Sequence, residues 1–163
     1  MLELLHIENI AVIQEADIQF RPGFNALTGE TGAGKSIVID AMEAVLGGRT
    51  SRELIRTGAD KAFVSAIFSD VPENLPGLTE NGAAPDEDGN LTLQREISSE
   101  GKSICRVNGR PLTVTQLRQI GKELLNIHGQ HDGQLLLDES RHLAYLDRFG
   151  QTAGSLAAYK KDY

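Results

Sequence analysis

Gly29-Glu30-Thr31-Gly32-Ala33-Gly34-Lys35-Ser36 fits the pattern G-x-x-x-x-G-K-[ST] at every fixed position of this 163-residue chain. The short apolar run Phe24–Thr28 precedes it. After it, apolar residues recur from Ile37 to Leu46 without a breaker until Gly47-Gly48. This order predicts a strand, a glycine-rich loop and a largely buried helix closed by glycine, which is the α/β arrangement of a P-loop.

The fixed residues of this loop have physical reasons to contact phosphate. Glycines let the backbone turn tightly, so that successive N–H groups point at phosphate oxygens, and the following helix adds about half a positive charge at its first turn. We expect Lys35 to reach the β- and γ-phosphates and the Ser36 hydroxyl to coordinate Mg²⁺. The sequence therefore predicts ATP and Mg²⁺ as ligands of residues 29–36, with Lys35 in a catalytic role.

A second G-K-S run shows how much the spacing matters. Gly101-Lys102-Ser103 has the same last three letters, but Glu96 stands where the first glycine should be. Because the loop needs glycine there to turn around a phosphate, we predict that this run is only the tip of a hairpin.

Composition limits the class of protein. Apolar residues make up 40% and charged residues 24% of the chain, which fits one globular domain with a real core. The net charge of −7 argues against a chain that coats nucleic acid by itself, because that task needs a broad Lys/Arg surface. The chain has neither a bilayer-length apolar run nor a signal-peptide layout, which indicates a cytosolic protein without membrane contact. The lone Cys105 is predicted to be a buried apolar residue.

Short apolar patterns separated by turn residues predict further strands. Leu2–Ile7 and Ala16–Phe20 are expected to form a hairpin at the amino end. The expected strands after the P-loop are Ala62–Phe68, Leu91–Ile97 and Ser103–Val107. The segment Pro72–Asn90 is rich in Pro, Gly, Asn and acid, which predicts an exposed insertion loop.

Helical patterns follow toward the carboxyl end. Thr113 or Thr115 can cap a helix whose apolar positions fall on one face. These positions are Leu117, Ile120 and Leu124. Another helix is expected after Asp138, ending near Gly150, and residues 155–163 begin a further helical pattern that is cut short.

Hydrolysis needs carboxylates near the metal and the attacking water, and the sequence leaves their source open. Leu135-Leu136-Leu137-Asp138-Glu139 resembles an apolar strand followed by an acidic pair, which would make the chain self-sufficient. Three leucines are weak strand formers, however, and Asp138-Glu139 also fits the acidic first turn of a helix.

The polar cluster His128-Gly129-Gln130-His131 follows a short apolar stretch. Gln130 can hydrogen-bond water and contact Mg²⁺ at the end of a strand. The alternatives are a plain polar loop and a zinc site made by His128, His131, Asp132 and His142, which no cysteine pair supports.

Three arginines follow the predicted P-loop helix: Arg49, Arg52 and Arg56. A guanidinium at this place can fold back on the γ-phosphate or meet DNA phosphates. A solvated charged surface is an equally good interpretation of the three.

Taken in order, these segments resemble the SMC-like branch of the ABC ATPases, and within it the bacterial RecN family. The resemblance rests on the P-loop together with an ordered set of secondary matches along the whole chain. These are Leu4–Ile10, Asp40-Ala41, Leu46–Arg49, Ile55–Gly58, Ile97–Ser99, Val107–Gly109 and Ile127–His131.

This resemblance implies a DNA double-strand-break repair ATPase in a bacterial cytoplasm, associated with the nucleoid and acting in recombination. Its head is an α/β P-loop lobe with a mixed sheet and an antiparallel β subdomain, joined to a C-terminal lobe of the same protein by a long coiled coil. Residues 1–150 would be the N-terminal lobe and 151–163 the truncated start of the coil. Gln130 would contact Mg²⁺ and the attacking water, and Arg49 the γ-phosphate. A second head and double-stranded DNA or DNA ends are the implied partners.

Three hypotheses follow. In the first, the chain is the ATP-binding lobe of such an ATPase, inactive or weak alone, and hydrolysis is completed by the C-terminal lobe and a second head. In the second, it is a self-contained P-loop phosphotransferase or kinase that uses Asp138 and Glu139. In the third, it is an association surface that binds ATP without turnover.

Overall fold

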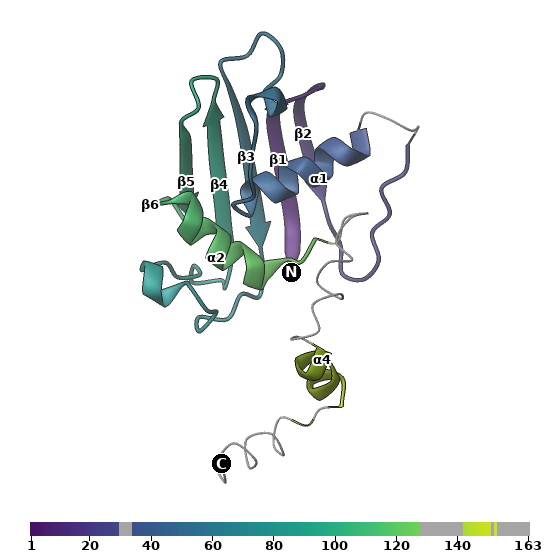
Figure 1. Ribbon diagram of the computed structural model, residues 1–163, viewed down its shortest axis with the longest axis vertical. Coiled ribbons are helices and arrows are strands. Elements are labelled where there is room, and N and C mark those ends of the chain that lie inside the picture. The colour runs from purple at the N-terminus through teal and green to yellow at the C-terminus, as the bar shows by residue number, and fades with distance from the viewer. Residues whose placement is uncertain (30–33, 128–141, 151, 153–163) are drawn as a thin grey trace. The chain divides into compact units, whose positions relative to one another are not determined.

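The computed structural model describes residues 1–29, 34–127, 142–150 and 152 of the chain (Figure 1). They belong to two compact units, Met1–Asn126 and Ile127–Tyr163. The first unit contains the sheet and the helix that follows the P-loop. The predicted lobe boundary at residue 150 stays a prediction.

One six-stranded sheet forms the body of the first unit, in the order β2-β1-β3-β4-β5-β6. The strands are β1 (Leu2–Ile10), β2 (Ile13–Gln19), β3 (Lys61–Phe68), β4 (Leu91–Ser98), β5 (Ser103–Val107) and β6 (Arg110–Leu112). The amino-terminal hairpin and the three later strands are confirmed, and Gly101 lies at the tip of the β4–β5 hairpin as predicted. Every described pairing is antiparallel, so the parallel part of the predicted mixed sheet is not among these strands.

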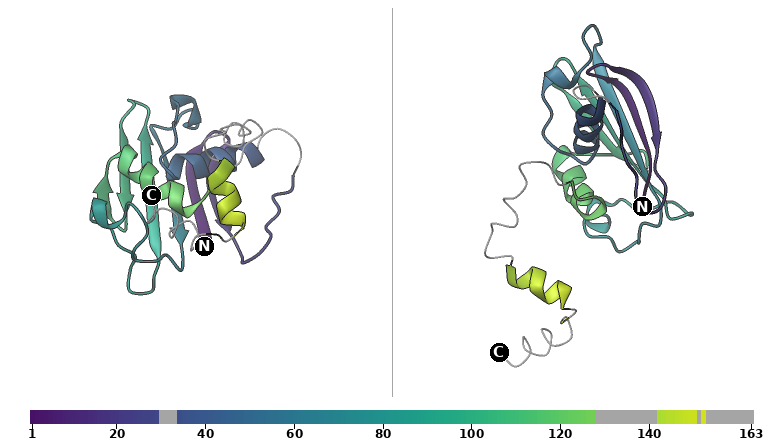
Figure 2. Two further views of the ribbon diagram at one scale, coloured as in Figure 1. Left: turned by 60° about the horizontal axis from the view of Figure 1, so that its bottom comes forward. Right: turned by 90° about the vertical axis from the view of Figure 1, so that its right-hand side faces the viewer.

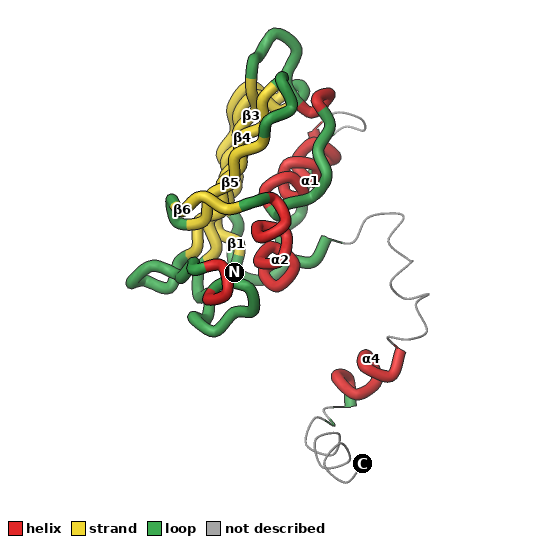
Figure 3. Tube along the Cα trace, turned by 60° about the vertical axis from the view of Figure 1, so that its left-hand side comes forward, coloured by secondary structure: helices red, strands yellow, loops and turns green. Residues whose placement is uncertain are grey.

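Two helices cover one face of this sheet, α1 (Gly34–Val45) and α2 (Val114–Leu124). Figure 2 and Figure 3 show both on the same side of the strands. The period-two alternation of the strands turns their apolar side chains toward these helices. Leu5, Ile7, Val64 and Leu93 are among the fully buried residues of this core. Between α1 and β3 the chain makes a short 3₁₀ turn, Arg52–Leu54.

Both helices have the end signals that the sequence predicts. Gly47 closes α1 with a left-handed φ of 84°, and the Gly48 N–H donates to the Glu43 carbonyl at 2.8 Å, the bond that defines a Schellman cap. At the start of α2, Thr113 rather than Thr115 is the N-cap. Its hydroxyl accepts from the Gln116 N–H, and the Gln116 side chain bonds back to the Thr113 N–H, which completes a capping box.

The predicted strand Phe24–Thr28 is wrong. The chain has no regular structure from residue 20 to residue 29, and the Phe24 side chain is 94% exposed. Asn25 gives the physical reason, because its side chain accepts from the Arg21 N–H at 3.0 Å and donates to the Arg21 carbonyl at 2.8 Å. This local side-chain pairing replaces the ladder that a strand would need.

The segment Pro72–Asn90 consists mostly of exposed residues, as predicted for a loop, but it is anchored to the core. Leu78, next to a 3₁₀ turn at Thr79–Asn81, is fully buried. Asn108 ties the segment down from the β5–β6 turn, since its side-chain amide donates to the Ala84 and Asn90 carbonyls. The loop therefore has a fixed base and an exposed surface.

The second unit contains α4 (His142–Phe149) in its described part. This confirms a helix that ends near Gly150, whose N–H donates to the Leu146 carbonyl at 2.8 Å. The predictions for Asp138-Glu139 and for residues 155–163 lie outside the described residues. No helix in the described part of the chain is long and apolar enough to cross a membrane.

Candidate nucleotide-binding site

The carboxyl end of the P-loop begins a helix as the sequence predicts, whereas its amino end follows an irregular segment and not the predicted strand. Gly34, Lys35 and Ser36 are the first residues of α1, so their N–H groups belong to the positive end of the helix dipole. The Lys35 Nζ donates to the Gly29 carbonyl, which brings the two ends of the loop together. Glu30, Thr31, Gly32 and Ala33, also predicted to bind phosphate, lie outside the described residues.

Room for an anion remains at both ends of this loop. A Cβ built at Gly29 or at Gly34 meets no atom within 4 Å, and Ser36 is exposed. The described residues at the two ends of the loop are therefore not packed into the core. An ammonium, a hydroxyl and a helix amino terminus together form a donor set suited to a polyphosphate and its magnesium ion.

A largely apolar cavity of about 430 Å³ lies beside Lys35. The inward-facing residues of β2 form one wall, and Val38 of α1 and Leu27 of the preceding segment complete it. The β2 residues are Ile13, Ala16 and Ile18. Thr28 and Gly29, which belong to the irregular segment before the P-loop helix, also line this cavity.

Arg49 lies at the other end of α1. It is exposed and lines a polar cavity of about 300 Å³ together with Asp40, Glu43 and Glu53. A helix rises 1.5 Å per residue, so Asp40 stands about 9 Å along the axis from Gly34 and the chain around Arg49 further still. Three carboxylates therefore line the same cavity as Arg49, and the predicted contact between Arg49 and the γ-phosphate stays a prediction.

Arg52 and Arg56 have internal partners. The Arg52 Nη2 donates to the Glu100 carbonyl at 3.4 Å, and the Arg56 Nη1 donates to the Val12 carbonyl at 2.7 Å. Arg52 thus contacts the tip of the β4–β5 hairpin, and Arg56 contacts the tip of the β1–β2 hairpin. These contacts favour a structural role for both over contact with DNA phosphates.

Gln130 and the cluster around it, His128 and His131, lie outside the described residues, so the predicted Mg²⁺ contact of Gln130 stays a prediction. The same holds for Asp132 of the alternative zinc site. Within the described ranges, no group of three His, Cys, Asp or Glu side chains is arranged to hold a metal ion. Cys105 is buried as predicted, and this burial raises the pKa of its thiol.

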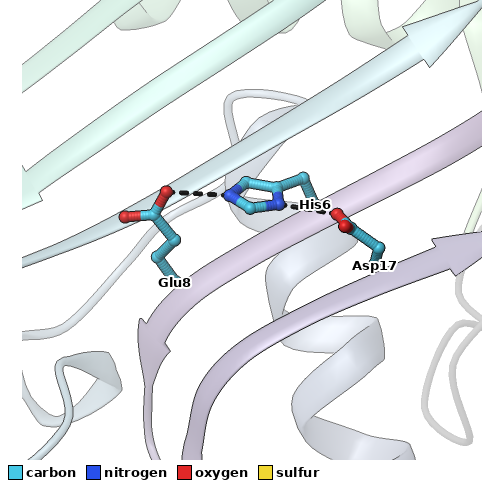
Figure 4. A network of polar contacts seen from close by, with 3 residues as sticks. All are labelled: His6, Glu8 and Asp17. Carbon is cyan, nitrogen blue, oxygen red and sulfur yellow. Dashed lines mark hydrogen bonds and ion pairs between the residues drawn. The ribbon is translucent and has the colours of Figure 1, made fainter.

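One polar network lies on the sheet face opposite the helices (Figure 4). The His6 ring contacts Glu8 through Nε2 at 2.8 Å and Asp17 through Nδ1 at 2.7 Å. The two carboxylates raise the pKa of His6, the Glu8 hydrogen bond most, while partial burial opposes them. Asp17 links β2 to His6, whereas Glu8 belongs to β1 like His6 itself. The two carboxylates contact different nitrogens of the ring and do not converge on one point.

Comparison with known proteins assigns the chain to a family. A family profile described as "AAA domain" matches residues 4–151. The chain belongs to the AAA domain family. Within it, the expected resemblance to RecN is confirmed along the whole chain. The "DNA repair protein RecN" of Bacillus subtilis (strain 168) is 43% identical over all of this chain, and that of Vibrio cholerae is 38% identical. The chain spans 29% of the length of each of these relatives.

Solved structures confirm the predicted fold class of this AAA-family chain, an α/β P-loop head. The Smc head domain from Pyrococcus yayanosii matches 98% of this chain with a TM-score of 0.69 at 24% identity, and 34% of that chain is covered. The SMC head domain from Thermotoga maritima matches 86% with a TM-score of 0.62 at 22% identity, and 51% of that chain is covered. At these identities the likeness concerns the fold alone.

Arg95 of β4 was not among the predicted site residues. Its guanidinium reaches the carboxyl end of α1, where the Nη1 donates to the Ala44 carbonyl at 2.8 Å. The signal was in the sequence, because Leu91, Leu93, Arg95 and Ile97 alternate along the strand and an inward-facing arginine in such a run needs buried acceptors.

Proposed function

We propose that this chain is the ATP-binding N-terminal lobe of a RecN-like ATPase that acts in recombinational repair of DNA double-strand breaks. Residues 29–36 bind the phosphates, and Ser36 holds the Mg²⁺ that bridges them. A C-terminal lobe and a second, ATP-engaged head complete hydrolysis, and the assembled protein engages double-stranded DNA or DNA ends. In that protein Gln130 contacts Mg²⁺ and the attacking water, and Arg49 is a γ-phosphate contact.

The observation that carries this proposal is the geometry at the start of α1. Lys35 and Ser36 stand in the first described turn of a helix whose amino end faces open space, and Lys35 reaches back to Gly29 across the loop. The relatives named RecN supply the context of DNA repair. The net charge of −7 agrees with DNA contacts that are local or supplied by other parts of the protein.

The test is the Lys35→Ala substitution in the complete protein. Removing one charge-assisted contact from a bound phosphate costs about 1.5–3 kcal/mol, so we expect ATP affinity to fall roughly tenfold to more than a hundredfold. ATP turnover should fall with it. Equilibrium titration with ATP and phosphate-release assays measure the two effects.

Lys102→Ala is the matched control, because Lys102 belongs to the G-K-S run at the β4–β5 tip and pairs there with Glu100 at 3.1 Å. It should leave ATP affinity unchanged. Equal affinities of the Lys35 variant and the unchanged protein would contradict the proposal.

The same assays separate the rival hypotheses when they are run on the 163-residue chain alone as well as on the complete protein. The comparisons do not favour the self-contained phosphotransferase, which predicts phosphoryl transfer by the chain alone through Asp138 and Glu139. The association surface without turnover predicts ATP binding and no phosphate release by the complete protein.

A further inference from the structure

The carboxyl end of α1 is fastened to the sheet by one buried arginine. Arg95 is 3% exposed, and its Nη1 donates to the Ala44 carbonyl at 2.8 Å and to the Gly48 carbonyl at 2.7 Å. Its Nε donates to the Ser103 hydroxyl at 2.9 Å and its Nη2 to the Thr50 hydroxyl at 3.2 Å. One side chain thus joins β4, β5, the end of α1 and the segment that follows it.

The acceptors of this guanidinium explain how a charge is tolerated there. All four are neutral oxygens, and one of them, the Ala44 carbonyl, belongs to the last turn of α1 at the negative end of the helix dipole. Burial lowers the pKa of Arg95, but the ordinary value for arginine is so high that the group stays charged. The side chain therefore acts as a permanent cationic cap on α1.

Close packing makes this end of α1 intolerant of displacement. Arg118 of α2 donates from Nε to the Gly47 carbonyl at 2.8 Å. A Cβ built on Gly47 would lie 2.6 Å from the Arg118 backbone nitrogen, and one built on Gly48 would lie 2.6 Å from the Glu43 carbonyl oxygen. The carboxyl end of α1 is therefore closely packed in one position, and the hydrogen bonds of Arg95 hold it there.

The same guanidinium bonds to both neighbours of Arg49. Gly48 offers its carbonyl and Thr50 its hydroxyl, while Arg49 between them is exposed. The backbone from which Arg49 projects is therefore fixed on either side.

We infer that Arg95 is a positioning residue for the nucleotide site: its guanidinium locks the end of α1 and the Gly48–Thr50 segment to the sheet, and so holds the P-loop at the other end of the helix in place. This inference rests on the proposed function. A short helix transmits such a constraint as a rigid rod, since its hydrogen bonds run along the axis. Arg95 itself does not contact nucleotide.

The test compares ATP affinity and folding stability of Arg95→Lys in the complete protein. Lysine keeps the charge but cannot serve four acceptors in one plane. We expect ATP affinity to fall roughly tenfold, with a lower melting temperature. Thr50→Val removes one bond without burying a new charge, and it should weaken ATP binding roughly two- to tenfold, which keeps the test available if Arg95→Lys does not fold.

Val107→Ala is the matched control, because Val107 is buried in β5, which packs against α2, and is not among the partners of Arg95. Its melting temperature should fall while ATP affinity stays within about twofold, as expected for independent sites. ATP affinity of both test variants within twofold of the unchanged protein would overturn the inference and leave the proposed function standing. Failure of the unchanged protein to bind ATP would remove the proposed function and the inference with it.

Discussion

Lys35 and Lys102 each stand in a Gly-Lys-Ser run, yet only the run of Lys35 lies at the start of a helix. The difference was predictable from one residue, since Gly29 stands at the head of the first run and Glu96 at the head of the second. Arg95 was harder to predict. Its inward position follows from strand alternation, but its partners at Ala44 and Thr50 are some 45 to 51 residues away in the chain, and no local pattern identifies such contacts.

His6 gives a prediction at this scale about pH. Glu8 and Asp17 raise its pKa, so protonated His6 is favoured in the folded state. The resulting stabilisation is complete below the unfolded-state pKa of about 6.5 and is lost as the pH rises through the higher folded-state value. His6 and its two carboxylate partners are partly exposed, so we expect the loss of folding free energy to be about 1 kcal/mol or less.

Denaturant unfolding at pH values on both sides of this window measures the effect, and His6→Gln is its control. The substitution removes the titrating group, so the stability difference between the two proteins should shrink toward alkaline pH. A difference that stays constant with pH, or grows toward alkaline pH, would contradict the assigned charge pairing.

Among the elements, those with strong local signals were predicted well. The capping box at Thr113, the closing glycines of α1 and the alternating strands all have a cause within a few residues. Phe24–Thr28 was wrong because composition alone does not reveal that the Asn25 side chain pairs with Arg21. The anchor of the long loop at Leu78 was missed, since its burial depends on distant parts of the chain.

The contact between α1 and α2 yields a prediction for Gly121→Ala. A Cβ at Gly121 would lie 2.5 Å from the Leu46 carbonyl oxygen and 3.0 Å from the Leu46 Cα. Alanine favours helices by up to about 1 kcal/mol over glycine, but overpacking costs about 1–3 kcal/mol. We expect a net loss of stability in thermal or denaturant unfolding.

Glu123→Ala is the control on the same helix, at an exposed position. It should change the free energy of unfolding by no more than about 0.5 kcal/mol. A Gly121 variant as stable as this control would show that the helices are not packed as closely as the structure has them.

At the scale of the whole molecule, the P-loop predicted the fold class, and the motifs in the rest of the chain predicted the family within that class. The α/β head and the RecN resemblance followed from ordered motifs, and profile and structural comparison agree with both. Two parts of the predicted site could not be tested in this way. Gln130 and the acidic pair Asp138-Glu139 lie outside the described residues, and the chain spans only 26–30% of the length of its RecN relatives.

The central claim is that residues 29–36 recognise a triphosphate with its magnesium ion. Competition binding tests it most directly: a fluorescent ATP analogue is bound to the complete protein with Mg²⁺, and ATP, ADP and AMP compete for it. Because the loop contacts the β- and γ-phosphates, ATP and ADP should displace the analogue, while AMP should fail to do so at comparable concentrations. Removing Mg²⁺ should lower the affinity for ATP. Displacement by AMP as strong as that by ATP, or no binding of the analogue at all, would contradict the account.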